Sequence, residues 1–129
     1  MKTINKTFNN DEIYRIAVEL LNSFSDSDQN TYLPAAVAFS IQKNKAAILN
    51  LANDIENHRV NILTKYSMNI EGDQLQIDPE KVNDANKELQ DLLEIEQEIK
   101  VYTFKIEEIM EVRFTPAQMN AILFMIDEE

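Results

Sequence analysis

The chain has 129 residues, of which 44% are hydrophobic and 27% charged, and its 23 acidic against 12 basic residues give a net charge of −11. This size and composition predict a single domain over residues 1–129 with its own core, and they argue against wholesale disorder. The excess of carboxylates argues against direct binding to nucleic acid, because that binding relies on clustered cations. A protein partner with a basic surface fits this charge better.

Turn-forming residues are scarce, and cysteine is absent. One glycine and three prolines leave little material for the turns of a many-stranded sandwich or barrel, so the composition favours helices. The absence of cysteine excludes disulfides, thiolate metal sites and cysteine nucleophiles, and it fits a reducing cytosol. The sequence has no run of about 18 apolar residues and no hydrophobic signal core, so we expect a cytoplasmic protein without a membrane span.

A first helix is predicted over residues 10–24. Asn9 to Glu12 offer an N-cap and an acidic first turn. Apolar residues then recur at helical spacing, namely Ile13, Ile16, Ala17, Leu20 and Phe24. The polar stretch 25–30 predicts a surface loop.

A second and much longer helix is predicted over residues 34–66. No helix breaker follows Pro34, and four isoleucines lie seven residues apart, at Ile41, Ile48, Ile55 and Ile62. At 1.5 Å per residue the helix spans about 50 Å. A row of this length needs a partner helix to cover it.

The partner is predicted over residues 79–98, where Asp78 and Pro79 form a cap followed by an N1 proline. We expect its apolar face to fold back antiparallel on residues 34–66. The charges support this pairing, since residues 34–66 hold four basic against two acidic residues, and residues 79–98 hold two basic against seven acidic ones. The connection at 69–77 contains the only glycine, Gly72, and predicts a small hairpin at the tip.

A strand and a last helix complete the prediction. Residues 99–106 are rich in β-branched and aromatic side chains, and either residues 112–114 or the N-terminal arm pairs with this strand. Thr115 to Gln118 match a capping box, and Met119, Ile122, Leu123 and Ile126 follow as a helical stripe. We therefore expect an α+β fold that is mainly α, with a long antiparallel helix pair, flanking N- and C-terminal helices and a small β element.

Several short motifs occur in the predicted elements, among them Lys43-Asn44, Arg59 ahead of residues 62–66, Lys87-Glu88-Leu89 and Gln118-Met119. Over about residues 33–126 these motifs resemble a family of uncharacterised small proteins from phages and prophages of Gram-positive bacteria. Relatives of this kind have a more turn-rich segment after the tyrosine at position 66. The resemblance implies a phage context, and it transfers no functional residue.

The only histidine, His58, lies four residues after Asp54 on the same helical face. The pair fits a mixed metal site or a switch, but the favoured interpretation is a structural histidine beside the isoleucine row. A single histidine excludes sites that need two, and no Gly-x-Ser-x-Gly turn occurs to expose a serine nucleophile. We therefore predict no catalytic residues, no metal and no cofactor.

Four carboxylates recur at three- and four-residue spacing on the third predicted helix, at Glu88, Asp91, Glu94 and Glu98. Di-metal helical bundles use such glutamates together with Glu-x-x-His pairs, which this chain lacks. Two interpretations stay open: a solvated charged face, and a partner-binding surface that imitates a track of phosphates. The heptad pattern also places Glu96 on the apolar face, where we expect Arg59 or Lys65 to pair with it.

These observations favour a non-catalytic phage protein that binds and inhibits a host protein with a basic surface, one that acts in defence or handles nucleic acid. The alternative is a structural or assembly component of a phage tail or capsid, for which a homo-oligomer is expected. An enzyme is the third possibility.

Overall fold

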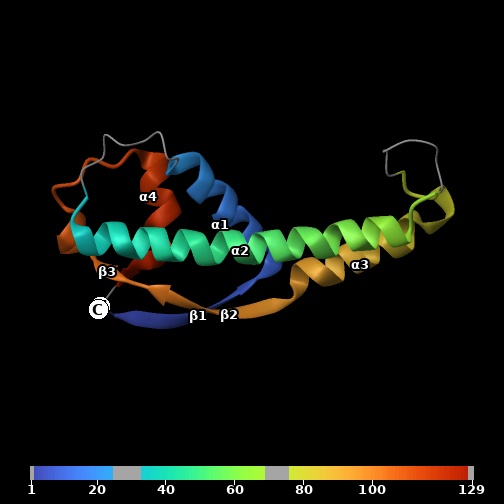
Figure 1. Ribbon diagram of the computed structural model, residues 1–129, viewed down its shortest axis with the longest axis horizontal. Coiled ribbons are helices and arrows are strands. Elements are labelled where there is room, and N and C mark those ends of the chain that lie inside the picture. The colour runs from blue at the N-terminus through green and yellow to red at the C-terminus, as the bar shows by residue number, and fades with distance from the viewer. Residues whose placement is uncertain (1, 25–32, 69–75, 128–129) are drawn as a thin grey trace.

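The computed structural model describes residues 2–24, 33–68 and 76–127. In these ranges the chain forms four α-helices and two two-stranded sheets, so the fold is α+β and mainly α, as predicted (Figure 1). The helices are α1 (Asn10–Ser23), α2 (Ala35–Lys65), α3 (Val82–Glu94) and α4 (Pro116–Ile122). The strands are β1 (Thr3–Asn9), β2 (Glu96–Tyr102), β3 (Phe104–Lys105) and β4 (Ile126–Asp127), and short 3-10 turns span Pro79–Lys81, Ile106–Ile109 and Leu123–Met125.

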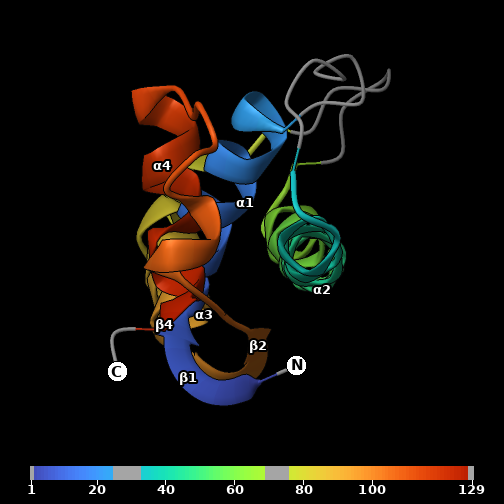
Figure 2. The ribbon, with the colours of Figure 1, turned by 90° about the vertical axis from the view of Figure 1, so that its left-hand side faces the viewer.

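The longest element is α2, whose 31 residues extend about 46 Å. Ile41, Ile48 and Ile55 are at most 5% exposed, which confirms the predicted isoleucine row over most of its length. Figure 1 shows α3 running back alongside the C-terminal half of α2, so the predicted helix pair forms. Figure 2, which shows α2 end-on, places α1 and α4 together on one side of it.

The helices α1 and α4 begin at capping boxes. Asn9 accepts a hydrogen bond from the Glu12 backbone at 2.8 Å, and the Glu12 carboxylate accepts one from the Asn9 backbone at 3.1 Å. Thr115 and Gln118 exchange the equivalent bonds at 3.1 and 3.0 Å. These reciprocal bonds satisfy backbone groups that a helix start leaves free, so both helices begin where the local sequence predicts. Fully buried side chains from both helices and the turn after α4 then join the core: Ile13, Leu20, Ile122 and Met125.

The N-terminal arm is the partner of the predicted strand. β1 pairs antiparallel with β2, with Thr3 opposite Tyr102 and Asn9 opposite Glu96. A separate parallel pair joins β3 to β4 near the end of the chain. The alternative pairing with residues 112–114 is wrong, because those residues belong to no strand.

The third predicted helix differs from the structure at its end. It was expected to reach residue 98, but α3 ends at Glu94, and β2 begins at Glu96 instead of residue 99. Ile95 between them is extended, with φ −63° and ψ 127°. Glu and Gln favour a helix here by intrinsic propensity, but the ladder to β1 satisfies the same backbone groups across the sheet. The long-range pairing therefore overrides the local preference.

The predicted tip hairpin is described only at its base. Ser67 and Ile77 form an antiparallel bridge, and the Met68 N–H donates to the Gln76 carbonyl at 2.8 Å. The centre of the hairpin, with Gly72, and the predicted loop at 25–30 lie outside the described residues. Within the described ranges, no helix combines the length and apolar character needed to cross a bilayer.

Candidate functional site

A surface groove lies where α3 runs along α2. One hollow of about 430 Å³ is lined by His58, Ile62 and Lys65 of α2 and by Glu88, Asp91 and Leu92 of α3, with Ile95 at its end. A second hollow of about 260 Å³ shares His58, Leu92 and Ile95 with the first and continues past Asp54 to Gln97. Because the two hollows adjoin, we treat them as one site, the α2–α3 groove.

Ile95 is the most exposed apolar side chain of this groove, at 52%. Its backbone is nevertheless held on both sides: its N–H donates to the Leu92 carbonyl at 3.3 Å, and its carbonyl accepts from the Asn10 N–H at 2.9 Å. The turn from α3 into β2 therefore presents an isoleucine at the surface on a bonded backbone.

Asn10 makes this turn possible. Its side chain is buried, and its Nδ2 donates to the Leu92 carbonyl at 2.8 Å while its Oδ1 accepts from Gln97 Nε2 at 2.7 Å. The last carbonyls of a helix lack partners within the helix, so this amide acts as a cap supplied by the start of α1. The sequence pattern predicts Asn10 only as part of a helix start, and no local signal indicates its contact with residues more than 80 positions away.

An ion pair bridges the two helices at one side of the groove. Lys65 Nζ lies 2.8 Å from Glu88 Oε1, and this hydrogen bond lowers the pKa of Glu88 and raises the pKa of Lys65. Both groups are near solvent, so the pair contributes little to stability. Glu88 is therefore already matched within the fold, and its charge is locally balanced.

The structure separates the four carboxylates predicted to share one face. Asp91 lines the α2–α3 groove and is exposed, and Glu94 is exposed and accepts a hydrogen bond from Gln90 at 3.0 Å. Glu98 is not on the helix: it lies on β2, opposite Thr7 of β1, and is exposed. The predicted partner surface of Glu88, Asp91, Glu94 and Glu98 is therefore wrong as a single helical face, because the chain becomes a strand after Ile95.

The prediction for Glu96 is wrong for the same reason. As the first residue of β2 it is exposed, and it does not lie on the apolar side of a helix. Arg59 pairs instead with Glu56 on its own helix, at 2.6 Å, and Lys65 pairs with Glu88. Because the Glu96 carboxylate is exposed, it does not need a cation to compensate for burial.

His58 and Asp54 both line the second hollow of the groove, one helical turn apart on α2. In the part of the chain that the structure describes, no group of three or more His, Asp or Glu side chains is placed to hold a metal ion. The two residues form part of the groove wall, and their role as a site stays a prediction.

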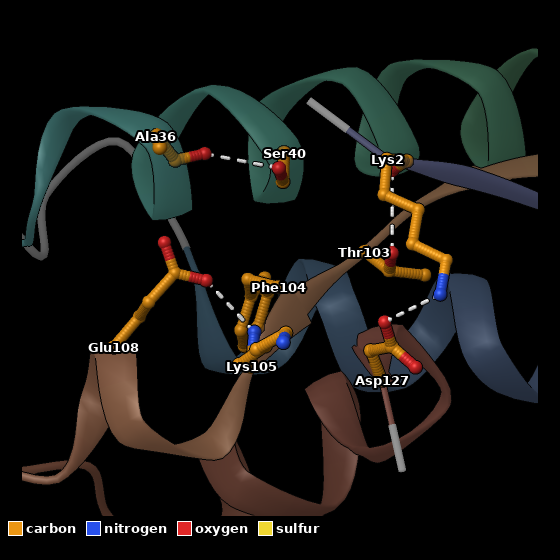
Figure 3. Close-up of a pocket in the computed structure, with 8 residues that line it drawn as sticks. All are labelled: Lys2, Ala36, Ser40, Thr103, Phe104, Lys105, Glu108 and Asp127. Atoms are coloured by element: carbon orange, nitrogen blue, oxygen red, sulfur yellow. Dashed lines mark hydrogen bonds and ion pairs between the residues drawn. The ribbon is translucent and has the colours of Figure 1, made fainter. Parts of the chain in front are cut away.

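A different pocket, of about 420 Å³, lies near the start of α2 (Figure 3). Its polar groups are used within the fold: Lys2 Nζ pairs with Asp127 Oδ2 at 3.0 Å, Thr103 donates to the Lys2 carbonyl at 3.2 Å, and Ser40 donates to the Ala36 carbonyl at 2.9 Å. The Glu108 carboxylate accepts from the Lys105 N–H at 2.8 Å. These contacts tie Lys2 to Thr103, which lies just before β3, and to Asp127 of β4, so we interpret the pocket as structural.

The α2–α3 groove differs, because the side chains of Asp54, His58 and Asp91 face solvent and form no hydrogen bond with another described residue. Comparison of the chain with protein-family models, curated proteins and solved structures found no match. The function is therefore inferred from the geometry and charge of this surface.

Proposed function

We propose that this chain is a non-catalytic protein that binds a basic surface of another protein through the carboxylates of α3. Taken with the resemblance to phage proteins, the proposal is a phage protein that inhibits a host protein of defence or nucleic-acid handling. Its carboxylates would occupy positions at which the host protein otherwise binds phosphate groups.

The observation that supports this proposal is the set of unmatched carboxylates on α3 and the turn before it. Glu80, Asp84, Asp91 and Glu94 are all exposed, and none forms an ion pair with another described residue. We call these four residues the acidic face. Side chains three or four positions apart on a helix lie about 5 to 6 Å from one another, so several can meet one basic surface at once. Although Glu94 accepts a hydrogen bond from Gln90, no ion pair among the described residues neutralises the charge of these carboxylates.

The first experiment is affinity capture from host lysate followed by calorimetry with the captured protein. In the variant Asp91→Lys/Glu94→Lys, attraction becomes repulsion, so we expect loss of binding with an unchanged circular dichroism spectrum. The matched control is Glu107→Lys/Glu111→Lys, which makes the same charge change at exposed positions after β3. The wild-type complex is also expected to weaken as salt rises, because dissolved ions screen exposed charges over a Debye length of about 8 to 10 Å.

An unchanged affinity in the folded Asp91→Lys/Glu94→Lys variant contradicts the proposal. Equal loss in both variants also contradicts it, since that result would reflect total charge and not the acidic face.

The second candidate is a component of a phage assembly, and exposed apolar side chains favour it. Val18 and Leu21, one turn apart on α1, are 54% and 50% exposed, and Met110 is 74% exposed. Such side chains can join copies of a chain. Light scattering over a range of concentrations distinguishes the candidates: discrete oligomers that Leu21→Lys dissociates support assembly, and a monomer at all concentrations supports the inhibitor.

A further inference from the structure

We propose that the α2–α3 groove binds a basic amphipathic helix of the partner, whose apolar side chains contact Ile62, Leu92 and Ile95 and whose cations face Asp54 and Asp91. The inference rests on the proposed function and specifies the part of the partner that docks. It adds an apolar contact to the charge interaction of the acidic face.

The apolar contact is centred on Ile95. Its side chain is about half exposed, while its backbone N–H donates a hydrogen bond to the Leu92 carbonyl and its carbonyl accepts one from the Asn10 N–H. Asn10 is in turn buried and bonded to Gln97. A backbone that is already held in place loses little entropy on binding, and covering the exposed apolar surface of Ile95 is favourable. Ile95 is therefore suited to contact an apolar side chain of a docked helix.

The length and shape of the groove fit a helix. Its wall on α2 runs from Asp54 to Lys65, a distance of about 16 Å along the helix axis. That length matches about three turns of a partner helix. A helix that lies between two others presents apolar residues at positions i, i+4 and i+7, and the apolar floor of the groove offers Ile62, Leu92 and Ile95 to receive them.

The charges on the rim of the groove indicate that the partner helix carries a positive charge. Asp54 and Asp91 are exposed on opposite sides of the groove and have no ion-pair partner among the described residues. The one lysine of the rim, Lys65, is paired with Glu88. A cationic helix therefore gains two carboxylates, whereas a second copy of this chain, with a net charge of −11, is repelled.

The test uses two labelled synthetic peptides of lysine and leucine, each long enough for about four helical turns. In one the leucines line a single face, and in the other the same residues are scrambled. Binding to the full chain is measured by fluorescence anisotropy. We expect the amphipathic peptide to bind at least about tenfold more tightly than the scrambled one.

The variant Ile95→Ser is expected to remove this preference, with an unchanged circular dichroism spectrum because the side chain is exposed. Leu123→Ser is the matched control, since Leu123 is 55% exposed and lies outside the groove. It is expected to retain the preference.

The outcomes separate the two proposals. If both peptides bind equally and both lose affinity in Asp91→Lys/Glu94→Lys, the acidic face binds cations but the groove proposal is overturned. A preference that survives Ile95→Ser also overturns it, as does a failure of both peptides to bind. In the last case the proposed function is judged separately, with the partner captured from lysate.

Discussion

The Tyr14 hydroxyl on α1 donates a hydrogen bond of 2.9 Å to Glu56 Oε2 on α2 and so links the two helices. Arg59, one turn further along α2, donates to both carboxylate oxygens at 2.8 and 2.6 Å. The bonds from Arg59, and then that from Tyr14, lower the pKa of Glu56 to about 2. Burial, and then the bond to Glu56, raises the pKa of Tyr14 to about 12.

Removing the Tyr14 hydroxyl is expected to weaken the contact between α1 and α2. Tyr14→Phe loses one hydrogen bond to a charged group, so the free energy of unfolding is expected to fall by about 1 to 3 kcal/mol. Urea denaturation measures this change. In a double-mutant cycle with Glu56→Ala the two effects are expected to be less than additive, and full additivity would show that the bond contributes nothing.

The Glu56 carboxylate also predicts a pH dependence. Its pKa falls from 4.5 to about 2 on folding, so its contribution is fully present above about pH 4.5 and is lost as the pH falls towards 2. The stability difference between wild type and Glu56→Gln is therefore expected to be larger at pH 6 than near pH 2. Urea denaturation of both proteins at the two pH values tests this. A difference that does not change with pH would mean that the carboxylate has the same pKa in both states.

Asn44 joins α2 to the end of β2 and is expected to be important for stability. It is 2% exposed, its Nδ2 donates to the Tyr102 carbonyl, and its Oδ1 accepts from the Tyr102 N–H, both at 2.8 Å. Asn44→Ala leaves two backbone groups without partners, which costs about 1 to 3 kcal/mol for each group that stays buried. The control Asn50→Ala, at an exposed position of α2, is expected to change stability by less than about 0.5 kcal/mol. Similar melting temperatures for the two variants would contradict this role.

Ile55 tests the isoleucine row. It is 2% exposed, so Ile55→Asp places an unpaired charge in the core and is expected to cost several kcal/mol out of about 5 to 15 for a typical domain. Val60→Asp makes a comparable change on the same helix at a position that is 38% exposed, and it is expected to have a much smaller effect. Thermal melting followed by circular dichroism compares them. If Ile55→Asp melts within a few degrees of wild type, α2 does not bury this row.

Local sequence determined where most helices lie. The isoleucines seven residues apart predict α2, and the buried positions Ile41, Ile48 and Ile55 confirm them. The capping residues Asn9 and Thr115 predict the starts of α1 and α4. These features depend on residues within a few positions of one another, so the positions of the helices can be predicted without knowing the rest of the fold.

Only the tertiary structure decided where α3 ends and what its surface presents. Glu98 is a strand residue because Thr7 of β1, more than 90 positions earlier, pairs with it in the sheet. Asn10 of α1 likewise lies at the end of α3, where its side chain caps the Leu92 carbonyl beside Ile95. Each contact joins a local pattern to a distant segment, and the energy of that pairing exceeds the weak intrinsic preference of glutamate and glutamine for a helix. The exposed isoleucine of the α2–α3 groove follows from this competition, which no single stretch of the sequence contains.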